Sequence, residues 1–317
     1  MTRIKDMKIG NSYEGIYILA SYEEAQKKNG SPYIKGVLID STGEINFNMW
    51  DIQPTLFSIE PGMPAKVIGD AGEFQGSKQL NMKGIWPVDI SVIDTDPGIV
   101  PTAPIPVKQM EQELKEMIDA IEDPDYRSVV QKIIFDHDFY PDFIKVAAAK
   151  SMHHDVVHGL LMHTLSVAKV ALSIASCYSE EFIDKSLLCA GAILHDVGKL
   201  KEFQFSRFGL VPEYSMIGNL QGHLFRGAHL IDNVCAQLNI PAEKRLLLVH
   251  LIASHHGKKE YGAIREPMCV EAMILSHADI IDADEYKYEQ AMLKGDAGEL
   301  YKFNGSSMYV PERFSKE

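Results

Sequence analysis

The sequence lacks the features that would place this protein in a membrane or outside the cell. No apolar run approaches the roughly 20 residues of a membrane-spanning helix, and the longest, 187–194 and 246–253, are interrupted by Cys, Gly or His. The basic N-terminus is not followed by an apolar stretch, so no signal peptide is expected. The four cysteines show no CxxC spacing, and we expect them to be buried free thiols. These absences predict a cytoplasmic protein without a membrane partner.

The sequence also has no excess of positive charge. Its 31 Lys and Arg stand against 44 Asp and Glu, which gives a net charge of −13 and argues against a broadly basic surface for nucleic acid. Residues 1–90 carry nine basic and eleven acidic residues, whereas the remainder carries 22 and 33. The 317 residues suffice for two or three domains, and the acidity belongs to the larger C-terminal part.

Residues 1–92 show the pattern of a small all-β domain. Short stretches that are rich in β-formers alternate with turn residues, and a longer connection at 53–64 has room for a helical turn. Five strands in under ninety residues predict a small closed barrel, and their order is that of an OB-fold. The expected strands are 13–21, 33–40, 44–51, 65–71 and 80–85.

OB-folds bind single-stranded nucleic acid by stacking bases on exposed aromatic rings beside basic residues. In the third expected strand Asn46 and Asn48 alternate with Phe47 and Met49, so we expect Phe47 and Met49 in the core. For each other aromatic residue a place in the core is the alternative, and the fold by itself does not determine the ligand. The candidate nucleic-acid contacts of the barrel are Tyr33, Lys35, Trp50, Phe74, Lys78, Lys83 and Trp86.

A proline-rich segment, 93–107, separates the two parts of the chain. Because proline lacks an N–H and fixes φ, this segment is expected to be a semi-rigid linker. From residue 108 the apolar residues recur at helical spacing, and no further strand pattern is convincing. We predict an all-α domain over 108–295, with early helices at 108–123, 126–135 and 141–150, and a C-terminal tail at 296–317.

Histidine is concentrated in the helical part, where eleven of the twelve lie between His153 and His277. Each alone has an ordinary explanation, such as a core residue or a histidine at a helix C-terminus. The set, however, offers only nitrogen and oxygen donors, which suit first-row divalent metals, and packed helices can direct such side chains at one site. A buried carboxylate is also costly unless it is paired or binds a metal. The candidate ligands are His163, the doublet His195–Asp196, His223, the pair His255–His256, and Asp279.

The order His163, His195–Asp196, Asp279 resembles the HD-domain superfamily of metal-dependent phosphohydrolases, and His223 with His255–His256 resembles its binuclear branch. The resemblance implies one metal held by His163, His195, Asp196 and Asp279. It implies a second held by Asp196, His223, His255 and His256, with Asp196 as the bridge. Asp196 and Lys199 are the expected catalytic residues: Lys199 would neutralise a substrate phosphate, or else it is a helix C-terminal cation. Arg226 and Lys258 are weaker candidates for contact with nucleic acid.

An OB-type barrel ahead of an HD domain resembles the YhaM family of bacterial cytoplasmic 3′-5′ exoribonucleases. The likeness spans nearly the whole chain and includes the phrases at 153–154, 159–164, 194–199, 222–223 and 254–257. It implies hydrolysis of single-stranded RNA to nucleoside monophosphates by a water that two metals activate, with single-stranded DNA as an alternative substrate. It also implies a homo-oligomer and Mn²⁺, with Co²⁺, Fe²⁺, Ni²⁺ or Zn²⁺ as alternatives. His158 departs from the small residue, such as glycine, that we expect there.

Three other functions fit less well. A cyclic-dinucleotide phosphodiesterase of the HD type carries Gly-Tyr-Pro after its His-His pair, whereas residues 257–267 contain no such motif. The barrel argues against a nucleotide phosphohydrolase. The complete set of ligands argues against a DNA-binding replication-accessory factor whose HD part is only architectural.

Overall fold

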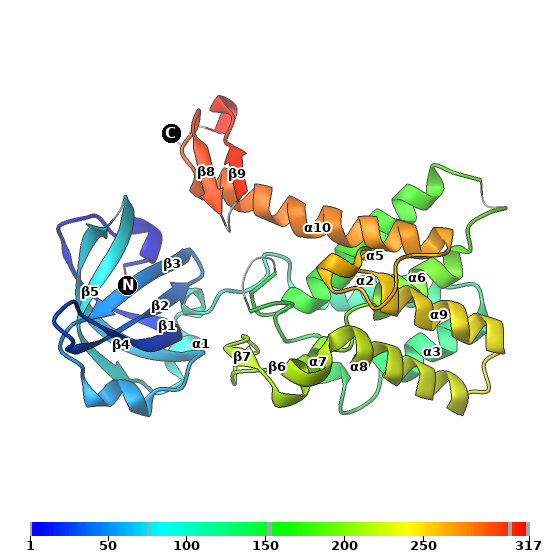
Figure 1. The fold of residues 1–317 in the computed structure, drawn as a ribbon, viewed down its shortest axis with the longest axis horizontal. Coiled ribbons are helices and arrows are strands. Elements are labelled where there is room, and N and C mark those ends of the chain that lie inside the picture. Colours follow the sequence, from blue (N-terminus) through cyan, green and yellow to red (C-terminus); the bar gives the residue numbers. More distant parts are fainter. Residues whose placement is uncertain (1, 75, 151–153, 180, 304–305, 315–317) are drawn as a thin grey trace. The chain divides into compact units, whose positions relative to one another are not determined.

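The computed structural model describes residues 2–74, 76–150, 154–179, 181–303 and 306–314. The chain forms two compact units, one of Met1–Thr102 with Gln204–Glu213, and one of Ala103–Phe203 with Tyr214–Glu317. The first contains the β-barrel and the second contains the helices (Figure 1). His153, which is part of the phrase at 153–154, lies outside the described residues.

The first unit is the predicted five-stranded barrel. Its strands close in the order β1-β2-β3-β5-β4, with antiparallel neighbours except for the parallel pair β3–β5. The short 3-10 helix η2 (Pro54–Ser58) fills the connection between the third and fourth strands, as expected. This is the OB-fold topology. The strands are β1 (Ser12–Gln26), β2 (Pro32–Asp40), β3 (Gly43–Met49), β4 (Met63–Phe74) and β5 (Ser77–Pro87).

Strands β1, β4 and β5 are longer than predicted, and the pairing passes over one residue in β1, Ala20, and one in β5, Lys83. The register of β1 against β2 shifts between Leu19 and Ser21, and that of β4 against β5 shifts between Ile68 and Gly69. An extra residue bends a strand and increases its twist, which allows one strand to take part in both walls of a small barrel. Alternation of polarity marks the core of each strand but not the point at which a bent strand ends.

The core of the barrel follows the alternation in β3. Phe47 and Met49 are fully buried, which confirms the prediction, whereas Asn46 is exposed. Gly36 of β2 lies opposite Phe47, and a Cβ atom there would lie 2.7 Å from the Phe47 ring. The Phe47 ring therefore fits because Gly36, on the neighbouring strand, has no side chain.

The described part of the helical unit is built from seven long helices, and three of them start at a residue whose side chain caps the helix. Asp123 accepts hydrogen bonds from two amides in the first turn of α3, and Asp184 and Ser215 each accept one at the start of α6 and α8. Helices α5, α6 and α10 pack against one another, and α9 packs on α6, α8 and α10. The long helices are α2 (Val107–Asp119), α3 (Pro124–Ile134), α5 (Gly159–Ser176), α6 (Lys185–Leu194), α8 (Met216–Gln237), α9 (Ala242–Ser254) and α10 (Val270–Lys294).

Helix α5 is long and apolar enough to qualify as a membrane-spanning helix, although no such segment was predicted from the sequence. By length and composition alone its 18 residues could cross a membrane, but 56% of them are buried inside the protein. His163, a candidate metal ligand, lies on this helix and is fully buried. These features are those of a core helix that carries one functional side chain.

The predicted helix at 141–150 is wrong beyond its first turn, because α4 spans only Tyr140–Phe143. Residues 144–148 pair instead with the segment before α5. The amide of His158 donates to the carbonyl of Lys145, and the amide of Leu160 donates to that of Val146. Hydrogen-bonding groups used in this way cannot close helical turns.

Other differences concern the linker, the tail and one cysteine. The linker contains two short turns, α1 (Val92–Thr95) and η3 (Pro97–Ile99), and the tail forms a hairpin of β8 (Leu300–Phe303) and β9 (Ser306–Tyr309) that packs on α10.

All four cysteines are free thiols, but Cys177 is exposed, contrary to expectation, because it follows the last turn of α5. A two-residue pair, β6 (Phe203–Gln204) and β7 (Glu213–Tyr214), precedes α8.

Candidate metal centre

The seven predicted ligands come from five separate segments of the helical unit. His163 lies in the middle of α5, and His195–Asp196 directly follow α6. His223 lies in α8, immediately after a break at Gly222. His255–His256 follow α9, and Asp279 lies in α10. Since these helices pack around a common core, their functional side chains meet at one place.

Four donor atoms form the first cluster. The Nε2 atom of His163 lies 3.1 Å from Nε2 of His195, 3.2 Å from Oδ2 of Asp196 and 3.3 Å from Oδ1 of Asp279. Nε2 of His195 lies 3.3 Å from the same Asp196 oxygen and 4.0 Å from the Asp279 oxygen. Ligands about 2.1 Å from one ion are roughly 3.0 Å apart in an octahedron and roughly 3.4 Å apart in a tetrahedron. The spacing therefore fits four ligands of a single cation.

Three histidines form the second cluster, on the other side of Asp196. The Nε2 atoms of His223 and His256 are 3.2 Å apart. The second carboxylate oxygen of Asp196, Oδ1, lies 3.6 Å from Nε2 of His223 and 3.7 Å from Nε2 of His255. One oxygen of Asp196 thus faces each cluster, whereas His195 faces only the first.

Two ligand atoms that face the second cluster are buried without a hydrogen-bond partner among the described residues. They are Oδ1 of Asp196 and Nε2 of His255. An unsatisfied buried polar atom costs roughly 1–3 kcal/mol, and more when it is charged. A cation between them would satisfy both, so the donor set fits a divalent metal on each side of Asp196.

In each of the five imidazoles, the ring nitrogen that faces away from the centre contacts a backbone carbonyl or a carboxylate. The Nδ1 atoms of His195, His255 and His256 donate to backbone carbonyls at 2.8, 2.8 and 2.9 Å. Nδ1 of His163 donates to Asp282 at 2.6 Å, and Nδ1 of His223 lies 2.8 Å from a carboxylate oxygen of Glu202. This arrangement directs every Nε2 inward and is typical of metal-binding histidines.

Three residues of this centre were missed in the sequence. Asp282 accepts hydrogen bonds from both His163 and His154 with one oxygen, at 2.6 and 2.7 Å. Glu202, at the end of the short helix α7 (Lys199–Glu202), accepts a hydrogen bond from the backbone amide of His223, and its other carboxylate oxygen lies 2.8 Å from Nδ1 of the same residue. A signal existed for Asp282, which follows Asp279 by three residues and so shares its helix face. For Glu202 and His154 we find no comparable signal.

The electrostatic environment favours the protonation states that metal ligands need. Burial alone would raise the pKa of Asp196, but the Lys199 ammonium and the nearby imidazoles hold it well below the ordinary value. Burial and the neighbouring imidazoles lower the pKa values of His255 and His256, which leaves both rings neutral. Metal binding requires ionised carboxylates and neutral imidazoles. Asp196, His255 and His256 meet this requirement. Burial would lower the pKa of His163, but the carboxylates of Asp196, Asp279 and Asp282 raise it well above its ordinary value, so His163 must release a proton when a metal binds.

Lys199 lies inside the centre. Its Nζ is 2.6 Å from Oδ2 of Asp196, and only 9% of its side chain is exposed. Burial lowers the pKa of Lys199, but the Asp196 carboxylate outweighs this and raises it. The residue therefore brings a fixed positive charge to the first cluster.

On the barrel, two of the predicted aromatic residues form one platform. The rings of Tyr33 and Trp50 are stacked, with centroids 4.7 Å apart, and 43% of Trp50 is exposed. The indole N–H of Trp50 donates to Asn81 at 3.2 Å, and Nζ of Lys27, which was not predicted, lies 5.6 Å above its ring. Lys35 is exposed on β2 beside Tyr33 and pairs with Glu23. An exposed stacked pair flanked by lysines is suited to bases and phosphates.

The other predicted contact residues do not join this platform. Phe74 is exposed at the β4–β5 turn, and Trp86 lies opposite Lys66 of β4 with its ring over Gly84. Lys78 reaches the carbonyl of Ile4, and Lys83 pairs with Asp70. In the helical unit, Arg226 contacts Gln221 at 3.4 Å, and Lys258 is exposed beside Glu260 and the ring of Tyr261.

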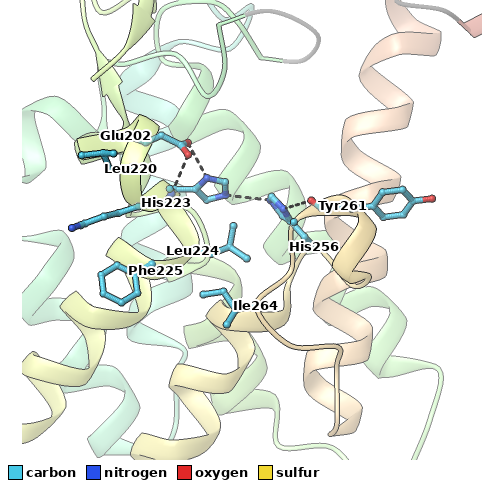
Figure 2. A pocket seen from close by; sticks show the side chains of 11 residues that line it. Glu202, Leu220, His223, Leu224, Phe225, His256, Tyr261 and Ile264 are labelled. Atoms are coloured by element: carbon cyan, nitrogen blue, oxygen red, sulfur yellow. Dashed lines mark hydrogen bonds and ion pairs between the residues drawn. The ribbon is translucent and has the colours of Figure 1, made fainter. Parts of the chain in front are cut away.

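An open pocket of about 640 Å³ adjoins the second cluster. Figure 2 shows His223 and His256 next to each other, joined by a dashed line, with Glu202 above His223 and the side chains of Leu224, Phe225 and Ile264 grouped below the two imidazoles in this view. Gly222, which also lines the pocket, has φ of 70° and ψ of 164°. Such angles are essentially restricted to glycine, and they turn the chain so that His223 starts the second part of α8.

The comparisons with known proteins agree with these observations. Residues 160–284 match the family model described as HD domain. The chain is 31% identical over 309 residues to proteins named 3′-5′ exoribonuclease YhaM from Bacillus velezensis and from Bacillus subtilis, with 96% of both chains covered in each case. A solved structure of the second OB-fold domain of replication protein A from Methanococcus maripaludis shows 16% identity and a TM-score of 0.23, over 28% of this chain and 94% of that one. The assignment of the barrel rests on its strand order.

Proposed function

Because the chain belongs to the YhaM family of 3′-5′ exoribonucleases, we propose that it removes nucleotides from the 3′ end of single-stranded RNA with the help of two divalent metals. The enzyme is a hydrolase of phosphodiester bonds, and nucleoside monophosphates are the proposed products. The observation that carries the two-metal proposal is the position of Asp196, whose two oxygens face two different sets of imidazoles. A shared carboxylate is what allows two cations to approach closely.

In this proposal His163, His195, Asp196 and Asp279 hold one cation, and Asp196, His223, His255 and His256 hold the other. Manganese is the first choice of metal, with Co²⁺, Fe²⁺, Ni²⁺ or Zn²⁺ as alternatives, since all of them accept imidazole and carboxylate ligands. When bound, two such ions would activate a water molecule and stabilise the charge that develops on the phosphate oxygens.

The other residues of the centre orient the metal-binding imidazoles or neutralise the charge of the substrate phosphate. Glu202 and Asp282 fix the rings of His223 and His163, so each Nε2 is oriented before substrate arrives. Lys199, held in the centre beside Asp196, contributes a positive charge for the scissile phosphate. Positive charge that is fixed where negative charge develops is among the largest contributions to phosphoryl transfer.

The barrel is proposed to hold the RNA strand. The Tyr33–Trp50 platform offers rings for base stacking, and Lys27 and Lys35 lie beside it for phosphates. Stacking requires no particular base, which suits an enzyme that degrades a strand of any sequence. Single-stranded DNA is the alternative ligand, because base stacking does not distinguish it from RNA.

One experiment tests the central proposal. A 5′-labelled single-stranded RNA, incubated with the protein and Mn²⁺, should give a ladder that shortens from the 3′ end, and chelation of the metal should abolish it. The Asp196→Ala variant should leave the RNA intact, and a DNA of the same sequence tests the second substrate. Endonucleolytic fragments, or full activity of Asp196→Ala in Mn²⁺, would contradict the proposal.

The cellular setting is also part of the proposal. We place the enzyme in the cytoplasm and expect a homo-oligomer. Light scattering coupled to gel filtration, with and without Mn²⁺, measures the oligomeric state directly, and a monomer under both conditions would contradict that part.

A further inference from the structure

We propose that the pocket beside His223 and His256 is the subsite for the base of the 3′-terminal nucleotide. This inference rests on the proposed exonuclease function and specifies how that function recognises its substrate. The ligand is the purine or pyrimidine ring of the residue about to be released, held by apolar contact and stacking.

The first argument is position. The imidazoles of His223 and His256, which belong to the second cluster, also form part of the pocket wall. A phosphate bound at that cluster carries its own nucleoside, and the adjoining open space is this pocket. Its volume of about 640 Å³ lies within the usual range of small-molecule sites, roughly 300–1,000 Å³.

The second argument is the chemistry of the lining. Phe225 and Ile264 are each 47% exposed and Leu220 is 76% exposed, although all three are large apolar side chains. Exposed apolar groups gathered around a hollow indicate a binding site. An aromatic ring among them provides a face on which a base can stack.

The third argument is that the polar side chains of the lining are already engaged. Both carboxylate oxygens of Glu202 bind His223, and the amide oxygen of Gln221 accepts from Arg226 at 3.4 Å. The hydroxyl end of Tyr261 points away from the two imidazoles (Figure 2). Apart from the NH₂ group of Gln221, these side chains have no polar group left for the edges of a base. A base in this pocket would therefore be held mainly by its faces, so any of the four bases would be accepted.

The test compares two 5′-labelled RNAs that differ only at the 3′ end, where one carries a normal nucleotide and the other a ribose phosphate without a base. With Mn²⁺, the wild type should make its first cut about 10-fold faster on the RNA with the base, as expected for one stacked base. Once the abasic residue has been removed, the next cuts should proceed at the normal rate.

The variant Phe225→Ala should lose this preference. We expect its first cut to be about 10-fold slower on the normal RNA and unchanged on the abasic one. Phe182→Ala is the matched control, because Phe182 is 75% exposed and does not line the pocket. Ile264→Ala, at the same pocket, serves as a second variant if Phe225→Ala fails to fold, and Mn²⁺ content is measured for each.

The outcomes separate the two proposals. A wild type that cleaves both RNAs equally fast, or a Phe225→Ala variant that slows both equally, would overturn the base subsite and leave the exonuclease function standing. A wild type that cleaves neither RNA with Mn²⁺ would overturn the proposed function and the subsite together. Equal effects of Phe182→Ala and Phe225→Ala would also overturn the subsite.

Discussion

Replacing Glu202 by glutamine should weaken the second metal site and leave the first intact. Glu202 is 7% exposed and contacts His223 twice: one carboxylate oxygen accepts from the backbone amide at 3.0 Å, and the other lies 2.8 Å from the ring Nδ1. Glutamine has the same size, but one of its two terminal groups is an NH₂ donor. At least one of these two contacts must therefore be lost, together with the negative charge that makes the imidazole a better ligand.

The size of the effect follows from these contacts. A hydrogen bond to a charged group contributes roughly 1.5–3 kcal/mol. Loss of a carboxylate behind a metal-binding histidine typically lowers metal affinity by about 10- to 100-fold, which corresponds to a similar energy. We expect the second Mn²⁺ to bind Glu202→Gln 10- to 100-fold more weakly. The first site should keep its affinity, because its His163 is held by Asp282 instead.

The assay is a Mn²⁺ titration in which the electron paramagnetic resonance signal of free Mn²⁺ reports the ions that remain unbound. The binding step that is lost in His223→Ala identifies the second site. Asp282→Asn is the matched variant for the first site, since Asp282 holds His163 as Glu202 holds His223. Wild-type binding by Glu202→Gln, or a loss of the same step in Glu202→Gln and Asp282→Asn, would refute the reasoning.

Three further predictions concern the bridge, the barrel and the break in α8. Asp196→Ala should release both metals, whereas His195→Ala should retain part of the second; metal analysis checks this, and equal losses would remove the case for a bridging Asp196. Trp50→Ala should weaken binding of single-stranded RNA about 10-fold by fluorescence anisotropy, while Phe57→Ala, at another exposed ring of the barrel, should bind normally. Gly222→Ala should cost about 1–3 kcal/mol of stability because of its backbone angles, so an unchanged thermal midpoint would show that the glycine is not required.

The candidate ligands could be identified in the sequence because part of their signal is local, and their division between two metals came from the resemblance to HD domains. Each is a histidine or aspartate set among apolar residues on a helix or at its end, and only a metal or a partner makes such a position tolerable. Their supporting residues could not be predicted in the same way. Asp282 and Glu202 are 119 and 21 residues away from the histidines they hold. Helical spacing identifies the residues that share a face, but not what that face will meet in the folded chain.

The backbone conformation of His158 explains why a small residue was expected at this position. We expected a small residue such as glycine there, and the backbone of His158 is indeed left-handed, with φ of 66°. Histidine is among the residues that tolerate this region. Its ring nitrogen also contacts the carbonyl of Ile144 at 2.6 Å, which helps to hold the turn that starts α5.

In the barrel, the alternation in β3 predicted which side chains are buried, but not which exposed aromatic residues would meet. Tyr33 and Trp50 come together because β2 pairs with β3 in a register that brings the start of one strand to the end of the other. Phe74 and Trp86 lie on parts of β4 and β5 beyond the short parallel pairing with β3. Strand register depends on the closed barrel as a whole, so a single strand does not contain that information.

The formal charge of the metal centre changes sign when two divalent metals bind, and this explains how an acidic helical unit could bind a negatively charged substrate. Asp196, Asp279, Asp282 and Glu202 are four carboxylates, and among the described residues Lys199 is the one ammonium in contact with them, which leaves a formal charge of −3 when the imidazoles are neutral. Such a centre would repel a phosphodiester. Two divalent cations would change the sum to +1, so the site becomes attractive to RNA only when it is loaded. Residues 91–317 carry 33 acidic against 22 basic residues, which disfavours contact of RNA elsewhere on this part of the chain. In the proposed function, the 3′ end is therefore attracted to the loaded metal centre.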